Sequence, residues 1–472
     1  MTILSLPWAE LCVALPLVGA AVVGRVRDPA AAGRLTLGVS LAVLAGSVMP
    51  WVAIRAGVPG GRLFAVDVLT APLLPLVALL HALTVLATAR VKLNRMSLGG
   101  HLVAESFRLG VFAAAPEAPW VLVVFLALGT LPPAVEVRRR GKSVRVYALH
   151  MGLFVGLLAT GLAAVEAGAA GVGAVLLLGA VLVRSGTVPT HLWVADLFEN
   201  ATFGTALLFV APLAGVYAAL RLVLPVAPEW VLQGVGWLSL VTAVYAAGMA
   251  AVQDDARRFY AYLFLSHASL VLVGLELHTA VSLTGALCLW VSVALSLGGL
   301  GMTLRAVEAR YGRLSLAGYR GLYDQSPSLA VGFLVTGLGS VGFPGTLGFV
   351  AAELLVDGAV AADVSVGVGL VVVAAVNGVA VLRAYFRLFT GSRHASTAPL
   401  GITARERAAV LVLAVLVVGG GLIPQALVAS RYKAADLLLR QRAASGVTGS
   451  GVGRADLTSR SFASTSISVS EA

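Results

Sequence analysis

The chain has 472 residues, of which 59% are hydrophobic and 12% are charged, and its formal net charge is +11. That charged share is about half the share in typical soluble proteins, so the composition excludes a soluble globule and requires lipid as solvent. Because the basic residues lie mostly in short loops between apolar runs, their charge indicates membrane topology rather than nucleic-acid binding.

Fourteen apolar runs of about 20 residues, the length that crosses a bilayer, follow one another along the chain. They cover residues 5–24, 36–54, 66–89, 99–115, 118–136, 145–166, 171–200, 203–224, 230–252, 258–276, 280–304, 328–356, 362–390 and 406–427. The first run has no basic region before it, so we expect a span and not a cleaved signal peptide. The fourth run is the weakest, because it contains Glu105 and Arg108. The sequence therefore predicts an all-α integral membrane protein of about fourteen transmembrane helices.

The spans divide the chain into five segments. We expect N-terminal transmembrane helices over residues 1–98, a first five-helix unit over 99–225, a second over 226–391, a C-terminal transmembrane helix over 392–440 and a tail over 441–472. The tail is rich in Ser, Gly and Thr without an apolar period, so we expect it to be disordered.

Two of the runs are too long for one crossing, and each contains a break rich in proline and glycine. The breaks lie at residues 186–189 and 342–345. Proline and glycine inside a span free backbone groups, and broken helices at matching places in two halves indicate an ion or substrate path. The two five-helix units would place the breaks equivalently, although packing kinks are the alternative interpretation.

The loop charges predict the orientation of the bundle. The loops after even-numbered spans are nearly free of basic residues, with Arg55 and Arg62 as the main exceptions. The loops after odd-numbered spans hold Arg25, Arg27, Arg34, Arg90, Lys92, Arg95, Arg138, Arg139, Arg140, Lys142, Arg257, Arg258, Arg305, Arg310, Arg313, Arg320, Arg393, Arg405 and Arg407. Since basic loops mark the cytoplasmic side, both termini are expected on the non-cytoplasmic side.

Three segments carry most of the polar side chains. In the first, Arg184 precedes Pro189 by five residues, and a cation at that depth indicates function unless it pairs with a carbonyl freed by the break. The polar residues that follow this break are His191, Trp193, Asp196, Glu199 and Thr202. The second segment contains Asp254, Asp255, Arg257, Arg258 and His267. The third contains Gly342, Pro344, Gly345 and Glu353.

Together these segments resemble the antiporter-like membrane subunits of respiratory complex I and of Mrp-type cation/proton antiporters. The signature of that family has a Lys, four further residues and Pro-Phe-His-x-Trp-Leu-Pro-Asp, and Arg184 stands here at the Lys position. The resemblance covers roughly residues 60–430. It implies two five-helix repeats related by inverted topology, and a polar axis at the membrane midplane along which protons move between buried Glu, Lys and His.

The chain departs from that family at the groups that would carry protons. Arg184 cannot release a proton as Lys can, so it would act as a fixed charge or gate. The fifth span has no acid before Pro132, and Glu136 beside Arg138 is expected in a solvated ion pair. The eighth and eleventh spans have no Lys or His, and the charged family position in the twelfth span aligns with Ala352, one residue before Glu353.

The remaining candidates are few. The predicted proton path or gate consists of Arg184, His191, His267, Glu353 and His150. For His150 and His267, a neutral buried histidine with one hydrogen bond is the alternative. Motif or structural roles are expected for Pro189, Trp193, Asp196, Glu199, Asp254, Arg257, Arg258 and Pro344. Of these, Asp254, Arg257 and Arg258, with Asp255, are expected to form a cytoplasmic ion-pair cluster that seats a helix.

The chain itself is expected to perform no redox chemistry. Cys12 and Cys288 lie far apart in apolar stretches, so neither a disulfide nor a thiolate metal site is expected. The sequence has no dinucleotide fingerprint and no cluster-binding cysteines. We therefore expect no cofactor and no metal, and a non-catalytic subunit of an NADH-quinone oxidoreductase-like complex.

Three functions stay open. The first is an antiporter-like membrane subunit of a proton-translocating complex of the NADH-quinone oxidoreductase or Mrp type, which conducts or gates protons along a midplane polar axis. The second is a degenerate, non-conducting structural subunit. The third is the membrane subunit of an inorganic-carbon uptake complex. In each, the chain is expected to be multi-pass in the cell (inner) membrane, with other membrane subunits and no nucleic acid as partners.

Overall fold

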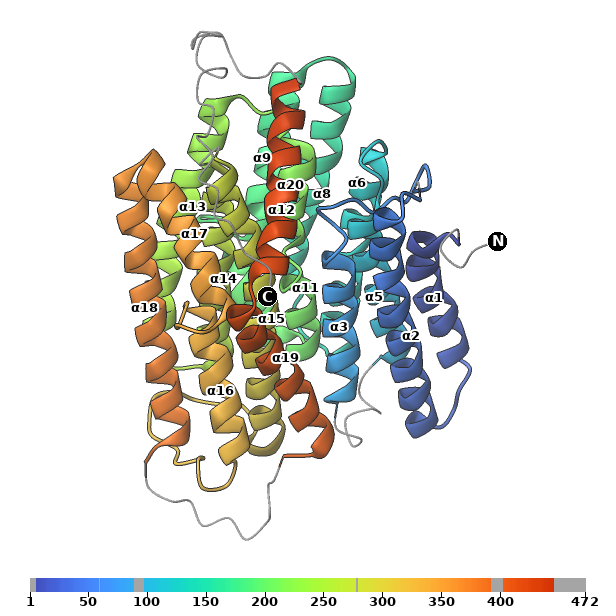
Figure 1. Ribbon diagram of the computed structural model, residues 1–472. Helices are drawn as coiled ribbons and strands as arrows, with labels where there is room; N and C mark the ends of the chain where they lie inside the picture. The colour runs from blue at the N-terminus through green and yellow to red at the C-terminus, as the bar shows by residue number, and fades with distance from the viewer. Residues whose placement is uncertain (1–5, 59, 89–96, 277–278, 392–401, 445–472) are drawn as a thin grey trace, which may run out of the picture.

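The computed structural model describes residues 6–58, 60–88, 97–276, 279–391 and 402–444. These residues form an almost entirely helical bundle whose helices run roughly along one direction (Figure 1). Two isolated β-bridges, Phe64 with Ala114 and Asp255 with Ser315, are the only strand-like pairings in the described ranges. The predicted all-α membrane fold is confirmed.

The helices follow the apolar runs in chain order. They are α1 (Trp8–Val23), α2 (Pro29–Arg55), α3 (Leu73–Leu86), α5 (Leu98–Ala113), α6 (Pro119–Leu128), α7 (Leu131–Arg139), α8 (Arg145–Glu166), α9 (Ala170–Ser185), α10 (Leu192–Asn200), α11 (Phe203–Val210), α12 (Ala214–Ala218), the π-helix η2 (Ala219–Val223), α13 (Glu229–Val252), α14 (Ala256–Glu276), α15 (Ala280–Tyr311), α16 (Pro327–Ser340), α17 (Leu347–Ala362), α18 (Val364–Phe389), α19 (Ala404–Leu422) and α20 (Gln425–Ala444).

Not every predicted span is a helix long enough to cross a membrane by itself. Within the described ranges, eight helices have the length and apolar composition for a crossing, or up to nine if the bent pair α19 and α20 is one span. Several other spans are shorter apolar helices, among them α1, α3, α9 and α16. The multi-pass membrane character is therefore confirmed, whereas the count of fourteen crossings stays a prediction.

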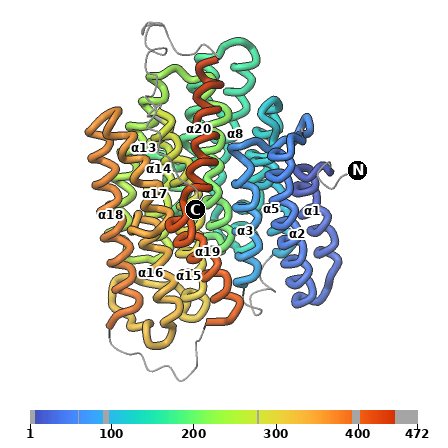
Figure 2. The backbone as a smooth tube through the Cα atoms, viewed as in Figure 1, coloured from blue at the N-terminus to red at the C-terminus, as the bar shows by residue number. Residues whose placement is uncertain are grey.

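The bundle is organised around α15. This 32-residue helix is buried along most of its length and packs against α14, α16, α17, α19 and α20. In the tube view, α1, α2 and α5 form one edge of the molecule and α18 forms the opposite edge (Figure 2).

The predicted breaks are present, and a further one was missed. The break between α9 and α10 falls at residues 186–191, and that between α16 and α17 falls at 341–346. Each lies in the fourth of five successive spans, counted from α5 and from α13, although a symmetry between these units stays a prediction. The eighth span is also broken, between α11 and α12, because Pro212 has no N–H to continue the helix. Phe203–Val223 nevertheless has the length and apolar composition for a crossing, so the predicted span over 203–224 is retained with a break inside it.

The C-terminal segment differs from the prediction. After α19 the chain bends by 79° and continues as α20 to Ala444, so the segment with one expected transmembrane helix contains two helices, which can form one broken span. Residues 441–444, expected in the disordered tail, are part of α20. Arg431 on α20 is fully buried and donates to the carbonyl oxygens of Leu69 and Val68 at 2.8 and 2.7 Å. These bonds hold a polar helix against the bundle. The predictions for residues 445–472, and for Arg90, Lys92, Arg95 and Arg393, fall outside the described residues.

Candidate functional site

The first break is closed by side chains from its own neighbourhood. Gly186 ends α9 in a left-handed conformation (φ 72°), and Pro189 follows in a cis peptide bond. Trp193 Nε1 donates to the carbonyl oxygen of Val183 at 2.8 Å, and the hydroxyl of Thr187 donates to that of Leu182 at 2.9 Å. The carbonyl oxygens of Leu182 and Val183, near the end of α9, are thus satisfied inside the protein by both backbone and side-chain donors, as a membrane requires.

Arg184 is buried at this break without a carboxylate partner among the described residues. Its side chain is 6% exposed, and its Nη2 donates to the carbonyl oxygen of Phe209 at 2.9 Å. The guanidinium also lies 3.9 Å from the ring centre of Phe209 and 5.6 Å from that of Trp193. A carbonyl and two aromatic faces stabilise the cation but do not neutralise its charge.

The break in the eighth span explains why the Phe209 oxygen is available to Arg184. Pro212 has no N–H, and the N–H of Leu213 turns back to the carbonyl oxygen of Val210 at 2.9 Å. Phe209 therefore loses its helical partner, which Arg184 replaces. The carbonyl oxygen of Pro212 is satisfied by Trp290 Nε1 at 2.9 Å. The sequence-based alternative paired Arg184 with a carbonyl freed by the break at 186–189, whereas its partner is a carbonyl from the break in the eighth span. The role of Arg184 stays a prediction.

His191 and His150 stand apart from Arg184. His191 begins α10, its Nε2 lies 3.4 Å from the hydroxyl of Tyr245, and its Nδ1 is buried without a hydrogen-bond partner. His150 is partly exposed on α8, and its Nδ1 lies 2.8 Å from the carbonyl oxygen of Val146 in the same helix. No hydrogen bond joins the two histidines in the described residues.

The second break is met by His267. This histidine is 1% exposed on α14, with Nδ1 2.8 Å from the carbonyl oxygen of Leu263 and Nε2 2.9 Å from that of Ser340, the last residue of α16. Next to it, Ser266 accepts a hydrogen bond from Asn377 Nδ2 at 2.9 Å. His267 therefore links α14 to the broken span directly.

Glu353 is not brought to this site. Its side chain is exposed on α17, and no hydrogen bond or ion pair in the described residues connects it to His267. Pro344 is likewise exposed within the break. A role for Glu353 in proton transfer stays a prediction that needs a partner chain or water beside that face.

The four residues predicted to form an ion-pair cluster make no ion pair with one another in the described ranges, and each instead pairs with a charge from elsewhere in the chain. Arg258 pairs with Glu199, Arg313 with Asp255 at 2.8 Å and Arg383 with Asp254 at 3.0 Å. Arg257 pairs with Glu308 and also donates to the carbonyl oxygens of Phe198 and Ala201 at the end of α10. The hydrogen bond to Asp255 raises the pKa of the Arg313 guanidinium in its loop. The pairs of Arg257 and Arg258 connect the start of α14 to α15 and α10, and the cytoplasmic position of these residues stays a prediction. Asp196 lies outside these ion pairs and accepts a hydrogen bond from Asn200 at 2.9 Å.

We expect Arg257→Met to cost about 2 kcal/mol of stability, because it leaves Glu308 and two helix-terminal carbonyls without a donor. Arg258→Met should cost less than about 1 kcal/mol, because that side chain is 53% exposed and its ion pair is solvated. Unfolding titrations with SDS from mild-detergent micelles would compare the two variants. Equal losses would show that the buried contacts of Arg257 do not hold the helices together.

Glu136 does not form the expected solvated pair with Arg138. Its Oε1 accepts the backbone N–H of Thr202 at 2.7 Å, and its Oε2 accepts the hydroxyl of Thr205. These residues begin α11, so Glu136 caps that helix at the terminus where a negative charge is favourable.

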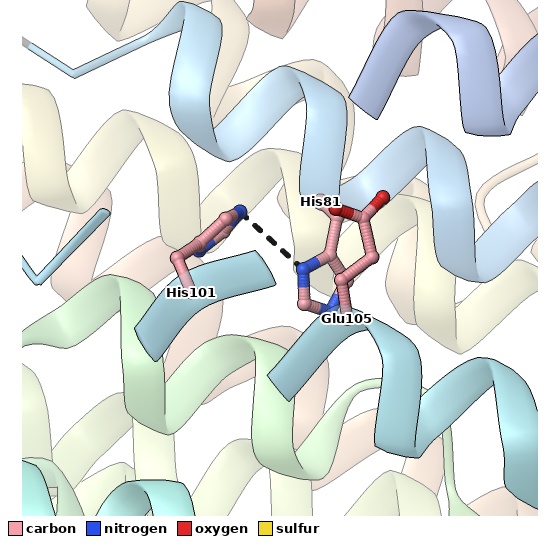
Figure 3. A group of neighbouring side chains, drawn as sticks. All are labelled: His81, His101 and Glu105. Carbon is pink, nitrogen blue, oxygen red and sulfur yellow. Dashed lines mark hydrogen bonds between the residues drawn. The ribbon is translucent and has the colours of Figure 1, made fainter. Parts of the chain in front are cut away.

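A buried polar cluster on α3 and α5 was missed by the sequence interpretation. The α3–α5 cluster consists of His81, His101, Glu105 and Arg108, all less than 9% exposed. One ligand-type atom from each of His81, His101 and Glu105 lies within 4.8 Å of the others, and Figure 3 shows these side chains turned toward one another. A signal was available, because His101, Glu105 and Arg108 are spaced by four and three residues and so share one face of an apolar helix.

Comparison with known proteins finds similarity to one family of membrane subunits. Residues 149–377 match the profile of a family described as NADH:quinone oxidoreductase/Mrp antiporter, TM. NADH-quinone oxidoreductase subunit M of Rickettsia bellii is 32% identical over 169 residues, which are 34% of each chain. NADH-quinone oxidoreductase subunit 13 of Thermus thermophilus is 29% identical over 302 residues, 57% of this chain and 63% of that one.

The fold is similar to that of a solved assembly. A chain of the Mrp complex from a Dietzia species superposes with a TM-score of 0.80 at 22% identity, covering 95% of this chain and 100% of that chain. At this identity the likeness concerns the fold alone. The sequence alignments span from about a third to under two thirds of the relatives' own length, as the shares above state.

Proposed function

Because residues 149–377 belong to the NADH:quinone oxidoreductase/Mrp antiporter family, we propose that this chain is an antiporter-like membrane subunit of a proton-translocating complex. In that complex it would conduct or gate protons along a polar axis between its helices. The observation that carries this proposal is that both predicted helix breaks lie inside the matched segment and each meets a buried ionisable side chain, Arg184 or His267.

His267 has the chemistry for a proton-exchange step at the second break. Both of its hydrogen-bond partners are carbonyl oxygens, which only accept, whereas a neutral imidazole has a single N–H. A neutral His267 therefore satisfies one carbonyl, and a protonated His267 satisfies both. Gain or loss of a proton would change the contact between α14 and the end of α16, which couples the protonation state to the break.

Arg184 would act as a fixed charge beside that path. Since arginine stays protonated, it repels protons without carrying them. Its neutral partners also favour a second candidate function, a degenerate structural subunit. A carbonyl oxygen and two aromatic rings are sufficient to stabilise an arginine whose role is only to support α11. The proton flux of an Arg184 variant separates these two functions.

We place the chain with other membrane subunits in the cell (inner) membrane. Both termini would lie on the non-cytoplasmic side, since the basic loops favour that orientation. The division into segments 1–98, 99–225, 226–391, 392–440 and 441–472 is part of this proposal, with the two middle segments as inverted repeats and the last two adjusted for α20.

Affinity purification of the tagged chain in mild detergent tests the partner. Copurification with redox or Mrp-type subunits would support the proposal and provide the complex for flux measurements. Copurification with one large soluble zinc protein would instead favour inorganic-carbon uptake. Isolation of the chain by itself would contradict every function that depends on a complex.

We expect Arg184→Met to raise the proton flux of the reconstituted complex by about tenfold or more. At an effective dielectric constant of about 20, a unit charge at about 8 Å changes a proton's energy by about 2 kcal/mol, and each 1.4 kcal/mol is tenfold. Arg184→Lys keeps the charge and should keep the flux low. A flux in Arg184→Met equal to that of the unaltered complex would assign Arg184 to the support of α11 alone.

A further inference from the structure

The α3–α5 cluster lies outside the segment that matches the family, and the proposed path through Arg184 and His267 does not use it. Its members come from two helices that pack side by side, His81 from α3 and the other three from α5. His81 and Glu105 are fully buried, and His101 and Arg108 are 8% and 7% exposed. So many ionisable groups at one buried place are costly, which makes the cluster a functional candidate.

The hydrogen bonds of the cluster run in one direction. Arg108 Nη1 lies 3.1 Å from His81 Nε2, and an arginine can only donate, so this nitrogen carries no proton. The proton of neutral His81 is therefore on Nδ1, which lies 3.4 Å from His101 Nε2. That nitrogen accepts in turn, so the proton of neutral His101 is on Nδ1. The contact with Arg108 therefore determines that each neutral histidine carries its proton on Nδ1, the ring nitrogen directed away from Arg108.

Two polar atoms in the cluster are buried without a partner, and they are complementary. Glu105 Oε2 accepts the hydroxyl of Ser40 at 2.7 Å, but Glu105 Oε1 has no partner. Arg108 Nε, a donor, has none either. The two side chains lie three residues apart on α5, the spacing at which an acid and a base can meet. Arg108 therefore contacts His81 in a place where it could pair with Glu105.

His101 connects the cluster to space near the surface. It lines a cavity of about 440 Å³ whose wall also contains Ser97, Glu136 and Arg139. It lines a second cavity, of about 250 Å³, beside Arg140 and Arg305. Since His81 occupies Nε2 of His101, Nδ1 is the ring nitrogen left for exchange with water in these cavities.

Other charged and titratable groups face the cluster from neighbouring helices. Arg305 on α15 lines a cavity together with His101, and Glu136 on α7 lines one together with His101 and Arg108. Tyr147 on α8 and Arg184 on α9 interact electrostatically with Arg108. Cys12 on α1 is near Glu105. A cavity of about 20 Å³, about the space of one water molecule, touches both Arg108 and Arg184. The cluster therefore borders the first break through Arg108.

We propose that His101, His81 and Glu105 form a proton-exchange site that opens to the cavity beside Glu136, and that Arg108 gates this site by moving between His81 and Glu105. The proposal rests on the proposed proton-translocating function and adds a site at which protons would enter the chain. It explains the direction of the hydrogen bonds, the two complementary unpaired atoms and the contact of His101 with the cavities.

The proposed exchange moves one proton from the cavity to Glu105. When Arg108 pairs with the Glu105 carboxylate, His81 can carry its proton on Nε2 and accept at Nδ1 from His101 Nε2–H. A hydronium ion in the cavity then gives a proton to His101 Nδ1 and becomes water. The Nε2 proton of His101 passes to His81 Nδ1, and the Nε2 proton of His81 passes to Glu105. One proton has entered and Glu105 is neutral. Arg108 is now free to donate to His81 Nε2, which is the arrangement in the structure.

A metal ion fits these side chains less well. His81 could offer Nδ1 to a metal, but its Nε2 would then carry the proton and face the donor Nη1 of Arg108 at 3.1 Å. A cation would also lie beside an arginine in a buried place. The direction of the hydrogen bonds therefore favours protons over a metal.

Infrared spectroscopy of the full-length chain in lipid at neutral pH tests the assignment, because a protonated carboxyl has a C=O stretch distinct from that of a carboxylate. We expect a protonated band in the unaltered chain that Glu105→Gln removes and Glu117→Gln, an exposed acid, leaves in place. His81→Leu removes the acceptor of Arg108, so Arg108 should pair with Glu105 and the band should disappear although Glu105 is present.

Two matched variants sharpen this result. His81→Gln keeps an acceptor for Arg108 and should keep the band, and Arg108→Gln in the His81→Leu background should restore it. Absence of the band in the unaltered chain, or its persistence in His81→Leu, overturns the gate. A bound transition metal in the purified chain that His101→Leu abolishes overturns the assignment to protons.

Flux measurements separate this site from the proposed function. We expect Glu105→Gln to lower the proton flux of the reconstituted complex by on the order of 10²-fold, as the loss of a positioned proton carrier does. If the unaltered complex conducts and Glu105→Gln conducts equally, the exchange site is wrong and the proposed function stands. If the unaltered complex does not conduct while the infrared results hold, the proposed function is wrong and the proton site stands.

Discussion

Proteoliposomes with the His267→Gln complex should translocate protons on the order of 10²-fold more slowly than those with the unaltered complex. His267 is the buried ionisable group that contacts the second break directly, through the carbonyl oxygen of Ser340. Glutamine has nearly the length of histidine and keeps a donor for that oxygen, but it cannot carry a proton. The variant therefore removes the exchange and retains one of the two contacts.

The matched control is Ser269→Ala on the same helix. Ser269 is buried and its hydroxyl has no hydrogen-bond partner, so its removal should change neither the flux nor the stability. Collapse of a pH gradient, followed with an entrapped dye, measures the flux of each complex. Normal flux in His267→Gln would assign this histidine to the support of α16.

The same flux measurement tests Glu353→Gln. Normal proton flux in that variant would show that the exposed Glu353 is not part of the proton path.

Gly348→Ala should cost about 3 kcal/mol of stability, at the upper end of the range for overpacked cores. Gly348 lies in the first turn of α17, and a Cβ atom there would lie 2.1 Å from the carbonyl oxygen of Gly339 on α16. Backbone cannot move aside as a flexible side chain can, so the two halves of the broken span would have to separate. The variant tests whether close backbone contact holds the second break.

Gly378→Ala on α18 provides the matched comparison, since a Cβ at that position meets nothing within 4 Å. Alanine is the better helix former there, so Gly378→Ala should stabilise the protein by about 0.5–1 kcal/mol. SDS titration would give both free-energy changes. A loss for Gly348→Ala no larger than about 0.5 kcal/mol would show that α16 and α17 are not tightly packed at this point.

Two buried arginines, Arg184 and Arg108, illustrate how a membrane protein holds charge without neutralising it. Arg184 binds a carbonyl that Pro212 leaves free, and Arg108 binds His81 while a carboxylate lies one helical turn away. Each has neutral hydrogen-bond partners, and each borders the small cavity between them. A pair of fixed cations would control the passage of protons more strongly than either does alone, since their potentials add.

Much of the architecture could be predicted without the structure. The scarcity of charge required a membrane, apolar runs located most helices, and Gly186, Pro189, Gly342 and Gly345 marked the two breaks, because these properties depend on composition and local backbone chemistry. The ion pairs of the charges around Arg257 could also be predicted, since a run of charges at a span end must find partners outside lipid. The span count was less certain, because short buried helices and long exposed ones have similar hydropathy.

The tertiary structure decided which polar side chains meet. His81 and His101 are 20 residues apart along the chain, and only the packing of α3 against α5 brings Nδ1 and Nε2 within 3.4 Å. The same holds for His267 and Ser340, and for Arg184 and Phe209, whose contact depends on how Pro212 bends the eighth span. Periodicity and motifs specify the face of a helix on which a residue lies. The neighbour across that face is set by helix packing, which sums many weak contacts over the whole bundle.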